Sequence, residues 1–293
     1  MAKKAYLISF VFILLFLNGC VSEKNNDNVK FGLVQWIGYA PLYVAEHDQK
    51  LPQNLRIIDF TSNYDIIEAL KEGRLDGAFL TMDEVLGLIQ EGIKLKVIYA
   101  IDTSNGSDAI LAKQTIANIK ELKGKRVAYE PQSVQEYLLF RALEKNGMQM
   151  SDIKNVLCKF NEQLELRRKN GFDGVVTFEP MKHKLLATGL HTLFSSRDIP
   201  NEIVNVFVVT ETAFKKNKET LIKTLQALLH ATKKIQKDKS TESVVATYLQ
   251  TTPDTLKNAY DGVVLLSKKA NLHLLSGEKT CSFAYDQAYE TFS

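Results

Sequence analysis

Short apolar runs alternate with amphipathic segments along most of the chain. The runs have the length of buried strands, and the segments between them place apolar residues at helical spacing. This alternation predicts an α/β fold in which helices flank mixed sheets. Strands are predicted at residues 29–34, 55–60, 76–80, 95–101, 109–112, 125–129, 156–160, 174–177, 191–194 and 204–209.

Helical spacing fills the segments between these strands and dominates after residue 211. Several of the helical segments end at a glycine, which is typical of a helix C-terminus. Helices are predicted at residues 41–47, 64–72, 83–90, 134–146, 162–169, 221–237, 242–249, 253–266 and 283–292.

One short pattern occurs twice. Leu75-Asp-Gly-Ala-Phe-Leu-Thr81 is followed by Met-Asp83, and Phe172-Asp-Gly-Val-Val-Thr177 is followed by Phe-Glu179. Each reads as Asp-Gly, an apolar strand, a threonine and then a carboxylate. The repeat predicts two similar lobes that each present a threonine and a carboxylate at the C-terminal end of a strand, where open α/β sheets bind ligands.

The N-terminus has the pattern of an export signal. Lys3 and Lys4 precede an uncharged apolar stretch, residues 6–17, that is shorter than the roughly 20 residues of a membrane-spanning helix. The following Leu17-Asn-Gly-Cys20 resembles the bacterial lipobox, which implies that residues 1–19 are a signal peptide and that Cys20 carries lipid. An uncleaved anchor and an ordinary secretory leader are the alternatives. The polar residues 20–28 are expected to form a flexible tether.

Charge and cysteine usage narrow the function classes. Without residues 1–19, Lys and Arg fall from 37 to 35 against 34 acidic residues, so no basic face for nucleic acid is indicated. The remaining cysteines, Cys158 and Cys281, are expected to be two buried free thiols, with a disulfide as the alternative in an oxidising compartment. The cysteines and histidines show no metal-binding spacing, and no metal or cofactor is expected.

Four segments in sequence order carry a family resemblance: residues 31–45 (FGLVQWIGYAPLYVA), 72–81 (EGRLDGAFLT), 119–128 (IKELKGKRVA) and 172–180 (FDGVVTFEP). Together they resemble substrate-binding proteins of the nitrate, sulfonate and taurine type, a superfamily that also contains pyrimidine-precursor binders and related enzymes. The resemblance implies a two-lobed periplasmic-binding-protein fold of type II, with chain crossings near Lys113 and Ile203. Lobe 1 would comprise residues 29–112 and 205–293, and lobe 2 residues 113–204.

The resemblance also implies a role: a lipid-anchored, monomeric solute-binding protein of the cell envelope, facing the periplasm or the outside, that delivers a small molecule to an ABC permease. A lipoprotein that senses the ligand for a membrane receptor is an alternative with the same fold. An enzyme of the pyrimidine-synthase type is disfavoured, because the cysteine-rich motif of that branch, a GxSxG motif and a Gly-rich phosphate loop are missing.

Five loops are expected to converge on the ligand between the lobes. In the first loop, residues 36–39, the rings of Trp36 and Tyr39 could stack on a flat or methylated group. Gly38 in this loop lets the backbone approach the ligand closely. Residues 81–83 and 132–134 lie at predicted helix N-termini, so a capping role is their alternative. Residues 102–108 are a polar loop that could also be a solvated turn. The fifth loop is residues 177–180, in which Glu179 is the expected specificity residue of lobe 2. The candidate ligand-binding residues are Trp36, Gly38, Tyr39, Thr81, Asp83, Ser104, Asn105, Asp108, Gln132, Ser133, Thr177 and Glu179.

The charge of these loops favours one ligand class. They contain Asp83, Asp102, Asp108, Glu130 and Glu179 but no lysine or arginine. A site for nitrate or a sulfonate would more naturally contain a cation. Aromatic rings together with carboxylates suit an amine, so an amine-bearing ligand or a neutral heterocycle is favoured over a simple oxyanion.

Overall fold

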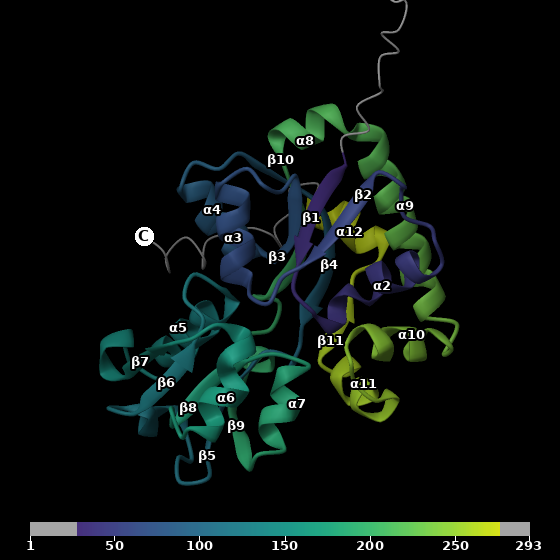
Figure 1. Ribbon diagram of the computed structural model, residues 1–293. Coiled ribbons are helices and arrows are strands. Elements are labelled where there is room, and N and C mark those ends of the chain that lie inside the picture. The colour runs from purple at the N-terminus through teal and green to yellow at the C-terminus, as the bar shows by residue number, and fades with distance from the viewer. Residues whose placement is uncertain (1–27, 276–293) are drawn as a thin grey trace, which may run out of the picture.

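Two mixed β-sheets divide the chain into two lobes in the computed structural model, which describes residues 28–275 (Figure 1). In the first sheet the strand order is β11-β4-β10-β3-β1-β2. β1 runs parallel to β2 and β3, and β10 runs antiparallel to β3 and β4. The strands are β1 (Val29–Leu33), β2 (Leu55–Asp59), β3 (Gly77–Thr81), β4 (Leu95–Ser104), β10 (Val204–Thr210) and β11 (Val263–Leu265).

The second sheet repeats this arrangement in the order β7-β6-β8-β5-β9. β6 runs parallel to β7 and β8, and β5 runs antiparallel to β8 and β9. The strands β3 and β8, which carry the repeated sequence pattern, therefore hold equivalent central positions in the two sheets. The second set of strands is β5 (Ala109–Lys113), β6 (Arg126–Tyr129), β7 (Lys154–Leu157), β8 (Gly174–Thr177) and β9 (Leu190–Ser195).

Helices cover the sheets, and their ends follow local sequence signals. The Ser62 hydroxyl accepts a hydrogen bond from the backbone N–H of Asp65 at the start of α3, and Gly73 (φ 69°) and Gly147 (φ 70°) follow α3 and α5. Lobe 1 contains α2 (Ala40–His47), α3 (Asn63–Lys71), α4 (Met82–Gln90), α8 (Glu211–Lys216), α9 (Lys218–Ile235), α10 (Thr241–Tyr248), α11 (Pro253–Tyr260) and α12 (Lys268–Leu275). Lobe 2 contains α5 (Val134–Lys145), α6 (Gln163–Arg168) and α7 (Met181–Leu186).

Two expectations about the chain path need correction. β5 pairs with β8 and β9, so the first crossing lies between the end of β4 at Ser104 and Ala109, earlier than the position expected near Lys113. The helix predicted at residues 253–266 ends at Tyr260, and β11 follows it as a strand antiparallel to β4. Its β-branched Val-Val pair favours a strand. The predicted helix 283–292, the leader and Cys281 lie outside the described residues.

The second crossing lies between β9 and β10 and is tied to helix α5 by a buried ion pair. The Arg141 Nε and Nη2 atoms lie 2.7 and 3.1 Å from the two carboxylate oxygens of Glu202, and the Tyr137 hydroxyl donates to the same carboxylate at 2.9 Å. The Arg141 and Glu202 side chains are only 10% and 5% exposed. This contact fixes helix α5 relative to the segment that connects the lobes.

Within residues 28–275, no helix is both long and apolar enough to cross a bilayer.

We expect Glu202→Gln to lower the free energy of unfolding by about 2 kcal/mol, because Arg141 and Tyr137 would lose a buried charged acceptor while the half-exposed Glu144 still pairs with Arg141. Urea unfolding followed by circular dichroism would measure this loss. Glu165→Gln is the matched control, since Glu165 pairs with Lys169 on the surface and both side chains are well exposed. That control should cost less than about 0.5 kcal/mol. Equal losses in the two variants would contradict a structural role for the buried pair.

Candidate functional site

A small cavity, partly open to solvent, lies where the two lobes meet. The space between its walls is ≈ 10 Å³, enough for about one water molecule. Most of its lining comes from lobe 1, and α5 and the loop after β8 close it from lobe 2. The lining residues are Val34, Trp36, Tyr39, Asn63, Thr81, Asp108, Val134, Phe178 and Asn205. A ligand larger than water therefore requires the lobes to separate.

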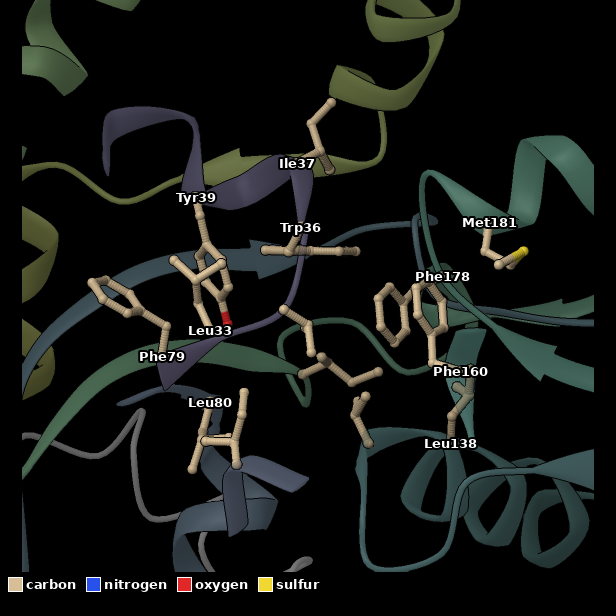
Figure 2. Close-up of a cluster of buried hydrophobic side chains, with 14 of the residues drawn as sticks. Leu33, Trp36, Ile37, Tyr39, Phe79, Leu80, Leu138, Phe160, Phe178 and Met181 are labelled. Carbon is tan, nitrogen blue, oxygen red and sulfur yellow. The ribbon is translucent and has the colours of Figure 1, made fainter. Parts of the chain in front are cut away.

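Aromatic rings from the two lobes meet across this cavity. Trp36 contacts Phe178 edge to face, with ring centroids 5.7 Å apart and planes at 80°. Phe178 in turn stacks on Phe160 at 4.0 Å. Figure 2 shows the Trp36 ring pointing toward the pair formed by Phe178 and Phe160. This contact joins lobe 1 to lobe 2 through apolar surface. The faces of these rings could also bind a flat or cationic group.

The Trp36 ring is held from behind by a buried carboxyl. Its Nε1–H donates to Asp102 at 3.2 Å, and Asn205 Nδ2 donates to the same carboxyl at 2.9 Å. The Tyr39 hydroxyl donates to Asn205 Oδ1 at 3.3 Å. Burial raises the pKa of Asp102 to about 7, against the opposing effect of these hydrogen bonds. A Cβ at Gly38 would collide with Asp102 and the Trp36 ring, so this glycine serves the Trp36–Asp102 contact.

Several acceptor atoms around the cavity have no hydrogen-bond partner among the described residues. Three line the cavity: Asn63 Oδ1, Thr81 Oγ1 and Asp108 Oδ2. Both carboxylate oxygens of Asp83 and Thr177 Oγ1 are also buried and unpaired in the described part of the chain. Buried polar atoms are paired in more than about 90% of cases, so this concentration of free acceptors is unusual. A molecule rich in hydrogen-bond donors would satisfy them.

The same region is acidic. Burial raises the pKa of Asp108 to about 7, and burial together with nearby Glu84 raises the pKa of Asp83 well above its ordinary value. Among the described residues that line the cavity, none is a lysine or an arginine. The Lys182 ammonium lies close by, 3.7 Å from the Glu179 carboxylate, and donates to the Gly106 carbonyl at 2.6 Å. The Lys182 charge lowers the pKa of Asp108, against the larger effect of burial, so this cation acts on the cavity from outside its lining.

Four of the predicted ligand-binding residues line the cavity: Trp36, Tyr39, Thr81 and Asp108. Asp83 and Gln132 lie together in an adjacent depression instead. Ser133 is the N-cap of α5, where its hydroxyl accepts from the Gln135 N–H at 3.2 Å, so the capping alternative describes its contacts.

The predicted polar loop, residues 102–108, is mainly a crossing between the lobes. The hydroxyls of Ser104 and Ser196 lie 2.8 Å apart, and the Gly106 N–H donates to Ser196 at 2.6 Å. These bonds connect the first crossing to the second. Asn105 is exposed and does not reach the cavity lining, whereas Asp108 at the end of the loop does.

In lobe 2, Thr177 is fully buried at the end of β8, outside the set of lining residues. Glu179, the expected specificity residue of this lobe, accepts a hydrogen bond from the His183 N–H at 3.2 Å and faces Lys182. Burial raises its pKa overall. In this closed arrangement its contacts are with the start of α7.

Sequence reasoning missed three polar residues of the site. Asn63 and Glu84 lie in the first turns of α3 and α4, where such side chains usually cap helices. Asn205 lies in the otherwise apolar strand β10, and a polar amide in a buried strand was a usable signal.

Within residues 28–275, no three His, Cys, Asp or Glu side chains are grouped as metal ligands. Cys158 is buried and without a disulfide partner in this range.

Solved structures with this fold include binding proteins. The alkanesulfonate-binding protein SsuA from Xanthomonas axonopodis pv. citri, bound to MOPS, aligns with a TM-score of 0.74 and 18% identity over 89% of this chain and 93% of its own. The ligand-binding component of an ABC-type import system from Staphylococcus aureus, with zinc bound, gives 0.73 and 16% over 90% and 91%. The nitrate-binding protein NrtA from Synechocystis PCC 6803 gives 0.64 and 12% over 78% and 68%.

These likenesses confirm the two-lobed periplasmic-binding-protein fold that the sequence resemblance implied. No curated protein matches the sequence. A family model described as the NMT1-like family matches residues 22–250, which is most of the chain. The chain therefore belongs to the NMT1-like family.

Proposed function

We propose that this protein is the solute-binding component of an ABC importer and captures a small molecule between its two lobes. The observation that carries the proposal is the cavity between the lobes, which Asp108 lines beside free acceptor atoms and where Trp36 contacts Phe178 of the other lobe. Closure of two lobes around such a cavity is a capture mechanism. One fold neighbour is named as the ligand-binding component of an ABC-type import system and another as an alkanesulfonate-binding protein, which supports this role.

The ligand carries hydrogen-bond donors and a positive charge. Asn63 and Asp108 offer unpaired acceptor oxygens to the cavity, and the unpaired Thr81 hydroxyl can accept as well as donate. Asp83 adds a further carboxyl group nearby. The Trp36 and Phe178 rings supply faces that attract a cation. An amine fits all of these features. A neutral heterocycle rich in N–H groups would satisfy the acceptors without using the charge.

The protein works at the cell envelope in this proposal. Cys20 would carry the lipid anchor and residues 20–28 would tether the lobes to the membrane, facing the periplasm or the outside, as a monomer that docks on its permease. Cys20 and residues 21–27 lie outside the described residues, so this part rests on the sequence pattern of the leader.

A thermal-shift screen of the chain from Ser22 onward tests the ligand class. Amines should raise the melting temperature by mass action, and sulfonates and nitrate should not. Asp108→Asn should weaken amine binding about tenfold or more, because a charge-assisted hydrogen bond contributes about 1.5–3 kcal/mol. Asp261→Asn is the control, since Asp261 is exposed and outside the cavity lining. A hit confined to oxyanions would refute the amine assignment.

Amine binding should strengthen as the pH rises from 5.5 to 8. The pKa of Asp108 is about 7 in the closed protein, above the value of about 4 of an exposed aspartate. Protonated Asp108 therefore stabilises the closed state, and this stabilisation is complete below about pH 4, the pKa of the exposed group. It is lost as the pH rises through about 7, the pKa of Asp108 in the closed protein. A cationic ligand replaces that proton.

Isothermal titration at constant ionic strength, with an amine that stays protonated below pH 8, would measure the change. We expect the association constant to rise about thirtyfold over this range in the wild type, as displacement of one proton from a group of pKa about 7 requires. The dependence should flatten in Asp108→Asn. A flat profile in the wild type would show that Asp108 does not face the ligand charge.

A further inference from the structure

Glu84 of lobe 1 bonds to a helix of lobe 2. Its Oε1 accepts from the backbone N–H of Val134, the first residue of α5, at 3.2 Å, and from Asn63 Nδ2 at 2.6 Å. Its Oε2 accepts from the Thr81 N–H at 2.9 Å. Glu84 is 3% exposed, so three donors from both lobes surround one buried carboxylate.

A second carboxylate makes the reverse contact. Glu130 of lobe 2 accepts from the N–H of Asn63, the first residue of α3 in lobe 1, at 3.2 Å. It is fully buried and also accepts from the Phe160 N–H at 3.4 Å. Each lobe thus places a carboxylate at a helix N-terminus of the other lobe, where the helix dipole favours negative charge.

Two other backbone donors near the start of α5 also bond within the chain. The Gln132 N–H donates to Glu136 Oε2 at 2.7 Å, and the Gln135 N–H donates to the Ser133 hydroxyl. In many proteins the same groups at a helix N-terminus bind phosphate, sulfate or carboxylate ligands. Here the position nearest the cavity is held by a side chain from the opposite lobe.

We propose that Glu84 is a specificity-determining residue: on closure its carboxylate occupies the α5 N-terminus and thereby excludes ligands with an anionic group. This deepens the proposed function and rests on it, because it concerns the same cleft. The exclusion has two parts. The three donors are already saturated, and the Glu84 charge repels an incoming anion in a buried site where repulsion is strong. Glu130 reinforces both effects from the other lobe.

The test is to remove the carboxylate and offer an oxyanion in its place. In Glu84→Ala the donors of Asn63, Thr81 and Val134 lose their acceptor, and sulfate or methanesulfonate can replace it. Trp36 is the single tryptophan of the chain and contacts lobe 2 in the closed state, so its fluorescence reports closure. Titrations begin at pH 6, below the pKa of about 7 of Asp108 and Glu130 in the wild type. They are repeated at lower pH, because Glu84 helps to raise both pKa values and its removal lowers them.

We expect a saturable fluorescence change with both anions in Glu84→Ala, and an association constant about tenfold or more above that of the wild type, in line with about 1.5 kcal/mol for a bond to a charged group. Sodium chloride keeps the ionic strength constant. Glu84→Ser, which retains a small polar group in the first turn of α4, repeats the test if the alanine variant folds poorly.

Two control variants locate the effect. Glu136→Ala removes a carboxylate from the same helix end outside the cavity lining and should gain no anion binding. Glu84→Ala combined with Val134→Pro should lose the gain, because proline lacks the N–H yet is tolerated at the first helical position. Anion binding by the wild type, equal binding by Glu136→Ala, or none by well-folded Glu84→Ala and Glu84→Ser would overturn the proposal. Failure to bind amines would count against the proposed function alone.

Discussion

The structure depends on how it accommodates carboxyl groups buried between its lobes. Removing a carboxylate from water costs several kcal/mol unless hydrogen bonds or a counter-charge offset the loss. Asp102 is stabilised by side chains of its own lobe, and Glu84 and Glu130 by backbone N–H groups of the opposite lobe. Asp83 and Asp108 keep oxygens without a partner among the described residues. Asp102, Glu84 and Glu130 therefore shape the closed state. Asp83 and Asp108 leave acceptor oxygens in it that a hydrogen-bond donor would satisfy.

The repeated topology explains why these groups meet. Both sheets have the same strand order and directions, so the C-terminal ends of their parallel strands face a common cleft. The C-terminal end of β3 brings Thr81 to this cleft from lobe 1, and the loop after β8 brings Phe178 to it from lobe 2. The crossings set the distance between the lobes, and the Arg141–Glu202 pair fixes α5 against the second crossing. The position of the Val134 N–H opposite Glu84 follows from this chain of contacts.

The fold was predictable from sequence because its signals are local. Strand-length apolar runs and glycine stops located most elements, whereas the Val-Val pair of β11 was hidden within a helix-like pattern and depends on pairing with β4. The site was predictable only where residues follow strand ends, as with Trp36, Thr81 and Asp108. Glu84 resembled an ordinary first-turn acid, because its partner Val134 lies 50 residues away and meets it only when the lobes close.

A fold shared with sulfonate- and nitrate-binding proteins does not determine what this cleft binds, because ligand selection depends on a few side chains that a sheet topology leaves free. Backbone N–H groups at a helix N-terminus are fixed by the fold and favour an anion. A glutamate at position 84 satisfies those groups from within the protein. Asp108, which lines the cavity and keeps an unpaired oxygen, then sets the charge that a ligand meets there. The same scaffold can in this way be converted from favouring anions to favouring donors and cations.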